Sequence, residues 1–443
     1  MKVMVCLISD QHVPNLLTIH AVLPDLLFLI VTSDMKRKNA ASNFLNALDI
    51  GGLSDLQKED RHEIIPLEDE NSIASAMKIF QDVISKYPDA ELFVNITGGT
   101  KPMSIAAFEF FKDKGNCTML YVPINDQTKA LKITGIKHQN PVDEEKAATR
   151  LKALLKANNA EPFYLDHKVS IGQFLAGYGF ELVSGESETK DKEKLALKWL
   201  DASVNLVANY NNQNVNEFLK RLAEISNKRK GRESGLNLQD SDELYLKDNG
   251  LFECLVKIFP SIDIEDSMIT GCLDAHEVEF LTGGWLEVFI WVLLFNHSDI
   301  FGIRDVHLNL EVGSKGPSDP RPKNEWDVTF MQGQSLCFIE CKTGTQKKKK
   351  GEDILYKVEA IKKHLGALRV KSYLATTSPN IIDKATGKIY ENLATRAALY
   401  NCKIIEGDKL HSLALMLLGQ EQKGPELIEL IANTFNLGKE AQN

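Results

Sequence analysis

Apolar and polar positions follow a regular pattern over the first part of the chain. Short apolar runs predict strands at 3–8, 26–32, 62–67, 91–96, 118–123 and 130–136. Apolar residues at helical spacing predict helices between them, at 15–23, 39–48, 73–86 and 101–114. Such alternation of strands and helices is typical of a parallel, doubly wound sheet. We therefore expect an α/β, Rossmann-like domain over residues 1–140.

After residue 140 the pattern becomes mainly helical. Helical spacing covers 144–158, 195–228 and 244–259, whereas 186–194 predicts a charged loop. A winged-helix connector is one candidate for this middle region, 141–275, and the sequence does not decide its fold. Strands and helices mix again over 276–443, where we expect a second α/β domain. Its predicted elements include a helix at 277–296, a strand at 306–312 and a helix at 353–368.

Length and composition describe an ordinary soluble protein of about three domains. Of the 443 residues, 43% are hydrophobic and 26% are charged. The net charge of -9 argues against a passive nucleic-acid coat, because indiscriminate phosphate binding needs positive charge, but it allows a local basic groove. The 7 cysteines form no CxxC pair and no zinc-like cluster, so we expect reduced thiols. No signal-peptide core follows Met1, and the apolar run 285–295 is too short to span a bilayer. We therefore expect a cytoplasmic protein with no membrane partner.

Two carboxylates and a lysine converge in a predicted β-hairpin. The segment 327–331 alternates polar and apolar residues, Gly333 permits a turn, and 335–342 runs back. Period-two geometry places Asp327, Glu340 and Lys342 on the face opposite the apolar side chains. Paired carboxylates can hold a hard divalent cation, and a neighbouring lysine can stabilise developing negative charge. The alternative is a solvated surface ion pair, which the apolar opposite face and Asp327 make the weaker interpretation.

A glycine-rich loop follows the predicted strand at 91–96. Thr97-Gly98-Gly99-Thr100-Lys101 leads into a helix, at the carboxyl edge where doubly wound sheets bind ligands. Its backbone amides, hydroxyls and lysine suit a phosphate or a nucleotide. The loop is neither a Walker loop nor GxGxxG, so from the pattern alone a simple connecting turn stays open.

These motifs together resemble a known family. Asp327 with Glu340-Cys341-Lys342 resembles the core of PD-(D/E)XK nucleases, although Trp326 stands where many members have proline. The segment 283–287, GGWLE, resembles the helix-borne motif of the type III CRISPR-associated effector nucleases that carry an N-terminal CARF sensor domain. The segment 95–101, NITGGTK, resembles the signature loop of those sensor domains. The resemblance implies a CARF domain at 1–140, a mainly helical middle at 141–275 and a restriction-endonuclease-like domain at 276–443.

For the sensor domain, the resemblance implies an activator, a cyclic oligoadenylate, bound across a homodimer interface. We expect the ring to be cyclic tetra-adenylate. The implied ligand-binding residues are Thr97, Gly98, Gly99, Thr100 and Lys101. By topology Ser9, Asp10 and Gln11 border the same crevice, and Met103 is expected to add an apolar contact.

For the nuclease domain, the resemblance implies hydrolysis of phosphodiester bonds in DNA, RNA or both, on single-stranded or nicked substrates. Asp327 and Glu340 would bind Mn²⁺ or Mg²⁺ with help from Glu287, and Lys342 would support the attacking water. Lys357, on the following helix, would contact a nucleic-acid phosphate.

Two other functions stay open from the sequence. One is a nucleotide-sensing, DNA-binding regulator with a purely structural C-terminal domain, and the other is an enzyme that cleaves its own cyclic activator. Two basic runs, at 228–232 and 347–350, are either solvated loops or contacts to a nucleic-acid backbone.

Overall fold

The computed structural model of the chain describes residues 1–123, 129–134, 163–183, 186–247, 249–314, 324–344, 348–378, 381–383, 386, 388–419 and 424–438. The chain forms two compact units, residues 1–181 with 314–320 and residues 182–313 with 321–443. Each unit is described by itself. The division of the chain into three domains stays a prediction.

A mostly parallel sheet forms the centre of the first unit. The strands β1 (Lys2–Leu7), β2 (Leu26–Thr32), β3 (His62–Leu67), β4 (Glu91–Asn95) and β5 (Cys117–Tyr121) are parallel, in the order β3-β2-β1-β4-β5. Two further strands, β6 (Lys129–Thr134) and β7 (Phe163–Tyr164), extend this sheet beyond β5 in antiparallel pairing. The prediction of an entirely parallel sheet is therefore wrong at β6. The connection from β5 to β6 is too short for the crossover helix that a parallel neighbour requires.

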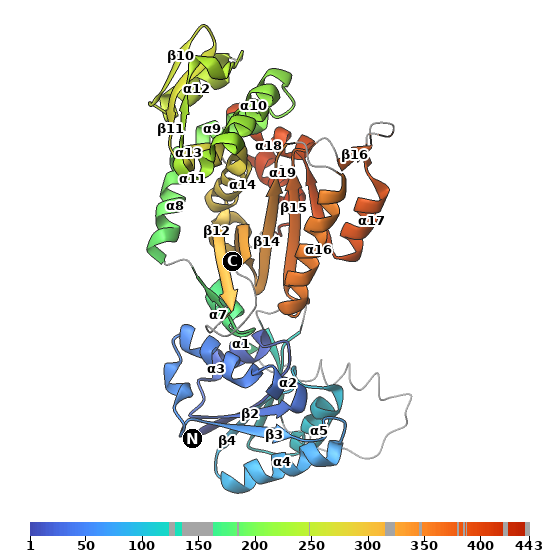
Figure 1. Cartoon of the computed structure of the whole chain (residues 1–443). Helices are drawn as coiled ribbons and strands as arrows, with labels where there is room; N and C mark the ends of the chain where they lie inside the picture. Colours follow the sequence, from blue (N-terminus) through green and yellow to red (C-terminus); the bar gives the residue numbers. More distant parts are fainter. Residues whose placement is uncertain are drawn as a thin grey trace. The chain divides into compact units, whose positions relative to one another are not determined.

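Helices cover both faces of this sheet (Figure 1). They are α1 (Val13–Val22), α2 (Ser33–Arg37), α3 (Ala40–Ile50), α4 (Ile73–Lys86), α5 (Lys101–Phe111) and α7 (Ile171–Ala176). On one face, Phe80 of α4 and Phe111 of α5 pack with Phe28 of β2 in a fully buried core. The apolar pattern explains this packing, because β2 is continuously apolar and α4 has apolar residues at helical spacing.

The second unit contains a mixed sheet in the order β18-β15-β14-β13-β12-β8. Its strands are β12 (Ile303–Ser314), β13 (Asn324–Gln332), β14 (Ser335–Lys342), β15 (Val370–Thr376), β18 (Cys402–Glu406) and β8 (Phe180–Leu182), which ends at the first residue of this unit. The strands β12, β13 and β14 pair antiparallel, whereas β14, β15 and β18 are parallel. Helices α14 (Trp285–Asn296), α16 (Lys348–His364), α17 (Glu391–Leu399), α18 (Gly407–Gly419) and α19 (Pro425–Phe435) complete this part.

Of the predicted middle region, 141–275, the part from residue 182 onward belongs to the same unit and is mainly helical, as predicted, whereas the residues up to 181 belong to the first unit. It contains α8 (Glu186–Lys198), α9 (Leu200–Ala208), α10 (Gln213–Arg229), α11 (Gly231–Ser234) and α12 (Asn249–Ile258). A small sheet, in the order β10-β11-β9, joins β9 (Leu236–Leu238) to the hairpin of β10 (Ile262–Glu265) and β11 (Met268–Leu273). Helix, strand, helix and hairpin in this pairing have the topology of a winged helix. The predicted charged loop at 186–194 is wrong, because its glutamates and lysines favour the helix α8.

The middle region and the large sheet share one hydrophobic core. Trp199 and Phe259 of the middle region pack around Phe280, which precedes α14, with ring centroids 4.7 and 6.0 Å from that of Phe280. One cluster of buried side chains continues from there to Val328 and Ile339 of the sheet. The middle region is therefore packed onto the sheet as part of one body.

One helical run of the described residues, Ala275–Asn296, is long and apolar enough to cross a membrane by length and composition. The prediction considered only the apolar run 285–295, and its conclusion that no run is long enough is wrong by this test, because the preceding helices join α14 in a run of 22 residues. Of its most apolar window, 67% is buried inside the protein. Burial of Leu286, Phe289 and Trp291 in the shared core accounts for the apolar character.

Candidate active site and sensor crevice

The predicted hairpin forms, and we call β13 with β14 the acidic hairpin. The two strands pair from Val328 opposite Ile339 to Gln332 opposite Ser335. Gly333, with φ of 58°, occupies the turn, where a left-handed backbone favours glycine. The apolar side chains of both strands lie in the shared core: Val328, Phe330, Cys337, Ile339 and Cys341. The sequence therefore predicted both the turn and the buried face correctly.

Beyond the last paired residues, the carboxylate of Asp327 turns toward β14. Its Oδ2 accepts a hydrogen bond from the backbone amide of Cys341 at 2.6 Å and one from Lys342 Nζ at 3.3 Å. Lys342 Nζ also lies 3.4 Å from Glu340 Oε2. The structure thus brings together Asp327, Glu340 and Lys342, the trio singled out in the sequence. The side chain of Glu340 is only 2% exposed, so this group is not a solvated surface pair.

Glu287 reaches the same region from the first turn of α14. Burial and the Asp327 carboxylate raise the pKa of Glu287 to about 8. Burial and the Glu340 carboxylate raise the pKa of Asp327 to about 6. Burial alone would lower the pKa of Lys342, but the carboxylates of Asp327 and Glu340 outweigh it and raise that pKa. The site is therefore a cluster of acids that needs positive charge to remain ionised.

Asn309 completes the cluster and was not predicted from the sequence. It lies on β12 between Leu308 and Leu310, which pair with the residues on either side of Asp327. The side-chain amide is oriented with its nitrogen toward two acceptors. Nδ2 of Asn309 donates to Glu287 Oε2 at 3.1 Å and to the backbone oxygen of Asp327 at 3.2 Å. Asn309 has φ of 52°, a conformation that asparagine adopts more readily than most residues. The polar alternation of the strand, in HLNLEV, was the signal that could have found it.

Lys357 lies on α16, and the structure pairs it with the acidic hairpin. Its Nζ is 2.6 Å from Glu340 Oε1 and 3.5 Å from the backbone oxygen of Glu325. Glu340 therefore lies between two lysines, Lys342 and Lys357. The predicted contact of Lys357 with a nucleic-acid phosphate stays a prediction.

The glycine-rich loop lies at the point where the strand order of the first unit reverses, between β1 and β4. We call this region the sensor crevice. A Cβ at Gly98 would lie 2.3 Å from the backbone oxygen of Leu7, so only glycine allows the loop to approach β1 this closely. Ser9 is the next neighbour, with Oγ 3.5 Å from the same Cβ position. The structure thus places the loop beside the 9–11 segment, as the topology predicted.

The hydroxyls of the loop hold it in place. Thr97 Oγ1 accepts from the backbone amide of Val122 at 2.8 Å, and Thr100 Oγ1 donates to the backbone oxygen of Glu70 at 3.0 Å. Met103 is buried in the core, and its sulfur lies 3.5 Å from the amide nitrogen of Thr100. Lys101 is exposed at the first position of α5. Ligand contacts by these residues stay predictions.

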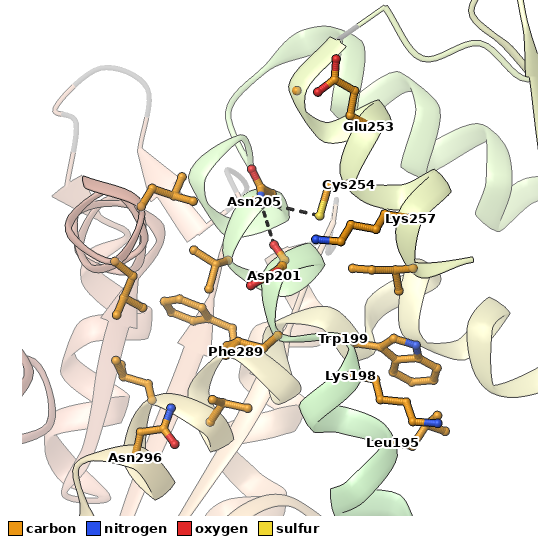
Figure 2. A pocket seen from close by; sticks show the side chains of 18 of the residues that line it. Leu195, Lys198, Trp199, Asp201, Asn205, Glu253, Cys254, Lys257, Phe289 and Asn296 are labelled. Carbon is orange, nitrogen blue, oxygen red and sulfur yellow. Dashed lines mark hydrogen bonds between the residues drawn. The ribbon is translucent and has the colours of Figure 1, made fainter. Parts of the chain in front are cut away.

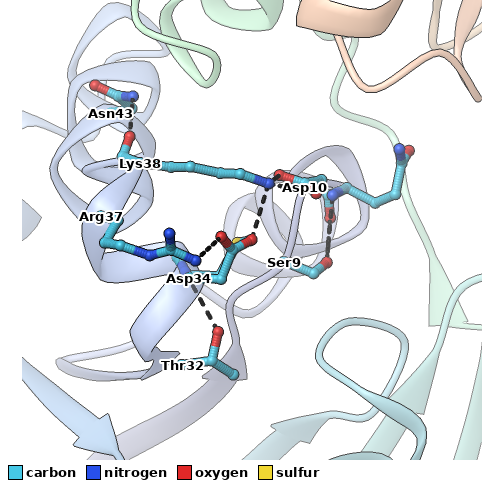
Figure 3. A network of polar contacts seen from close by, with 9 residues as sticks. Ser9, Asp10, Thr32, Asp34, Arg37, Lys38 and Asn43 are labelled. Atoms are coloured by element: carbon cyan, nitrogen blue, oxygen red, sulfur yellow. Dashed lines mark hydrogen bonds and ion pairs between the residues drawn. The ribbon is translucent and has the colours of Figure 1, made fainter.

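A network of charges borders the sensor crevice (Figure 3). Lys38 Nζ lies 2.9 Å from Asp10 Oδ1 and 3.0 Å from Asp34 Oδ2, and Arg37 pairs with Asp34 at 2.8 Å. Gln11 lies close by, with its backbone amide bonded to Ser9 Oγ at 3.3 Å. Lys38 was not predicted, because no local pattern connects it with Asp10, which lies 28 residues earlier.

Two basic runs were open between a solvated loop and a nucleic-acid contact. In the first, Arg229 pairs with the buried Asp242 at 2.5 Å, and Arg232 donates to Thr282 Oγ1 at 2.9 Å and to its backbone oxygen at 3.0 Å. These arginines therefore connect parts of the second unit. The side chains of the second run, 347–350, lie outside the described residues.

A cavity of about 850 Å³ lies between the middle region and α14 (Figure 2). Trp199, Asp201 and Asn205 line it from one side, Cys254 and Lys257 from α12. Asn205 Nδ2 donates to the backbone oxygen of Asp201 at 2.7 Å and to Cys254 Sγ at 3.8 Å. None of the predicted site residues lines this cavity.

Comparison with known proteins identifies both ends of the chain. The family model of the Card1 CARF domain matches residues 3–148, and that of the Card1-like endonuclease domain matches residues 274–405. No curated protein matches the chain.

Two solved structures are similar over nearly the whole length. Protein VC1899 from Vibrio cholerae has a TM-score of 0.72 and 17% identity, with 94% of this chain and 97% of that chain covered. Can2 from Sulfobacillus thermosulfidooxidans, in complex with cyclic tetra-adenylate, has a TM-score of 0.63 and 21% identity, with 94% and 99% covered. At these identities the likeness shows the fold.

The matches confirm the predicted fold class: a CARF domain, a helical middle and a C-terminal endonuclease domain. The two family models together cover more than half of the chain, and the acidic hairpin lies within the second. The chain therefore carries a Card1 CARF domain and a Card1-like endonuclease domain, and it belongs with the CARF-domain nucleases that these two models describe.

Proposed function

We propose that this protein is a metal-dependent nuclease that a cyclic oligoadenylate, with cyclic tetra-adenylate as the first candidate, switches on. The reaction is hydrolysis of phosphodiester bonds in single-stranded or nicked DNA or RNA. The observation that carries the proposal is the buried group of Asp327, Glu340 and Lys342 on the acidic hairpin, inside the matched endonuclease domain.

The chemistry of the acidic hairpin fits a divalent cation such as Mn²⁺ or Mg²⁺. Hard cations take oxygen ligands, and Asp327 and Glu340 supply carboxylates that are largely removed from solvent. Among the described residues, no three His, Cys, Asp or Glu side chains gather closely enough to hold a metal together. Asp327 and Glu340 would therefore hold the ion with help from backbone oxygens and water, and the expected help of Glu287 as a third ligand stays a prediction. When bound, the ion supplies Lewis-acid stabilisation and an activated water.

Lys342, Glu287 and Asn309 would orient the attacking water, share a proton and position the carboxylates. Lys342 stays protonated between two carboxylates, so it can orient the attacking water and stabilise negative charge on the phosphate. Glu287 has a raised pKa and can share a proton with the cluster from α14. Asn309 holds the Glu287 carboxylate and the backbone of Asp327 in one arrangement.

The activator would bind in the sensor crevice. The helix α5 begins at Lys101, and the positive end of the helix dipole together with that exposed lysine favours phosphate oxygens. Can2, which has the same fold, was solved with cyclic tetra-adenylate. Binding between two copies of the domain in a homodimer, in the cytoplasm and without a membrane, completes the proposal.

The rival function, a DNA-binding regulator, has one supporting observation, the winged-helix topology of the middle region. The charges of the middle region argue against this rival function. The hairpin of β10 and β11 carries Asp263 and Glu265, with Asp266 at its turn, and no basic residue. A wing that enters a DNA groove needs positive charge to bind phosphates.

One experiment tests the proposal. The purified protein is mixed with Mn²⁺ or Mg²⁺ and labelled single-stranded, nicked and duplex DNA and RNA, with and without cyclic tri-, tetra- and hexa-adenylate. We expect cleavage only with both metal and one ring size, and chelation should abolish it. The same reactions, followed by chromatography of the activator, test whether the sensor domain degrades it. Cleavage that is independent of every ring would overturn the gating, and no cleavage under any condition would overturn the nuclease.

A further inference from the structure

The carboxyl ends of β14, β15 and β18 open into a cavity of about 860 Å³, here called the strand-end pocket. Carboxyl ends of parallel strands are where α/β sheets bind ligands. The lining comes from the three strand ends, from one face of α10 and from the start of α14. It includes Thr343, Thr377, Asp408, Asn216, Ala223 and Trp285.

The pocket is continuous with the acidic hairpin. Thr343 directly follows Lys342, and the backbone amide of Thr377 donates to the backbone oxygen of Lys342 at 3.2 Å. Gly283 packs against Thr343, since a Cβ at Gly283 would lie 3.3 Å from Thr343 Oγ1. The segment that leads into α14, the helix of Glu287, therefore contacts the end of the acidic hairpin. A nucleic-acid strand bound at Lys342 would therefore have a neighbouring nucleotide close to this pocket.

The charges of the described lining disfavour a phosphate. Among the described residues that line the pocket, four carboxylates, those of Glu217, Glu224, Glu406 and Asp408, accompany one ammonium, that of Lys220, and Glu224 is paired with Arg221 at 3.6 Å. A phosphate would meet net repulsion here, whereas the lysines beside Glu340 offer it positive charge. The pocket suits a neutral group that donates and accepts hydrogen bonds.

A nucleobase has this chemistry. Side-chain amides and hydroxyls of the lining can reach its edge, carboxylates accept from exocyclic amino groups, and Leu219 and Leu281 supply apolar wall. We propose that the strand-end pocket receives the base of one unpaired nucleotide next to the scissile phosphodiester. This inference rests on the proposed nuclease function and adds a subsite to it. Since a paired base is stacked inside a duplex, the pocket also selects single strands.

The test fills the pocket from the side away from the acidic hairpin. Ala223→Phe, on α10, places a ring in the cavity, and Asn214→Phe, at an exposed position of the same helix outside it, is the matched control. Substrates are end-labelled DNA and RNA strands in which one abasic nucleotide is moved along the sequence. The abasic strand keeps every phosphate and lacks one base.

For the wild type and Asn214→Phe, we expect cleavage of a bond to fall about tenfold or more when the abasic nucleotide occupies one fixed position beside it. Ala223→Phe should cleave the intact strand at that reduced rate and show no further loss with the abasic strand. A thermal melt and activator binding check folding. If the melting temperature of Ala223→Phe is clearly lower than that of the wild type, Glu224→Gln is used instead. This variant should change the ranking of cleavage rates among substrates that differ only in the base at that position.

The outcomes separate this inference from the proposed function. A wild type that cleaves intact and abasic strands equally would overturn the subsite while leaving the nuclease intact. Folded Ala223→Phe with the wild-type pattern would do the same. A wild type that cleaves no intact strand would overturn the nuclease and the subsite together.

Discussion

Glu340 and Lys342 of the acidic hairpin lie near the carboxyl end of β14, and the sensor crevice lies at the carboxyl ends of β1 and β4, but the charges of the two sites have different surroundings. The side chains of Asp327 and Glu340 are 14% and 2% exposed. Those of Asp10 and Lys38, at the crevice, are 54% and 48% exposed. The acidic hairpin buries its carboxylates, whereas the ion pairs of the sensor crevice are exposed to solvent.

This difference predicts where a single charge matters. Charges that are removed from water interact strongly and are costly to leave unpaired, whereas exposed pairs are screened. Chemistry at the acidic hairpin should therefore depend steeply on each carboxylate. Affinity at the sensor crevice should depend on the loop amides and Lys101, and little on the bordering ion pairs.

The largest effect is expected from Glu340→Gln, which keeps the shape of the side chain and removes its charge. Losing a metal ligand should reduce ligand-activated cleavage by more than the ~10–100-fold that losing an outer-shell partner typically costs. Activator binding should stay near the wild-type value. Cleavage of a fluorescent single strand beside a thermal melt measures both. Full activity in a folded Glu340→Gln protein would remove the hairpin from the chemistry.

The next effect concerns Lys101→Ala in the sensor crevice. If Lys101 contacts the activator ring, loss of a charge-assisted hydrogen bond should weaken binding by ~1.5–3 kcal/mol, about ten- to a hundredfold. Activity at saturating activator should change less than affinity. Titration calorimetry gives the affinity, and an unchanged value would place the ligand away from this end of the loop.

A smaller effect is expected on the pH dependence of stability, through the buried carboxyl of Glu287. The pKa of Glu287 is about 8 in the fold, above its ordinary value of 4.5. The folded state therefore favours the neutral acid, and its stability falls as the pH rises from about 4.5 toward 8. Metal-free Glu287→Gln should be about 1–3 kcal/mol more stable than the wild type at pH 8, and nearly equal at pH 5. Denaturant titrations in chelator at both pH values measure this, and an identical difference at both would contradict it.

The smallest effect is expected from Lys38→Met, which removes the centre of the exposed network. Exposed pairs contribute about 0–1 kcal/mol each, so the free energy of unfolding should change by no more than about 1 kcal/mol. The difference should shrink further in high salt. A larger loss in denaturant titrations would mean that the crevice depends on its charges as the acidic hairpin does.

Local patterns sufficed for most of the fold. The bounds of β2, β3 and α4 follow from apolar period and capping, and the pairing of the acidic hairpin follows from alternation around Gly333. The trio of Asp327, Glu340 and Lys342 could be found because all three lie on one short hairpin.

Partners distant along the chain could not be found in this way. Asn309 reaches Glu287 from another strand, and Lys357 reaches Glu340 from the following helix. Arg229 was open between solvent and nucleic acid until its buried partner, Asp242, was known. Each of these contacts depends on tertiary packing, which spacing along the sequence does not encode.

The aromatic contact of Trp199, Phe259 and Phe280 has a consequence for how the second unit comes apart. These rings join the middle region to the helical segment before α14, and the same buried cluster continues to the sheet, so the two should melt in one cooperative transition. Calorimetry of residues 182–443 should then show a single peak. Insertions or deletions in the middle region should therefore disrupt the shared core. A domain exchange between relatives should give a folded protein only when residues 182–443 are exchanged as one piece.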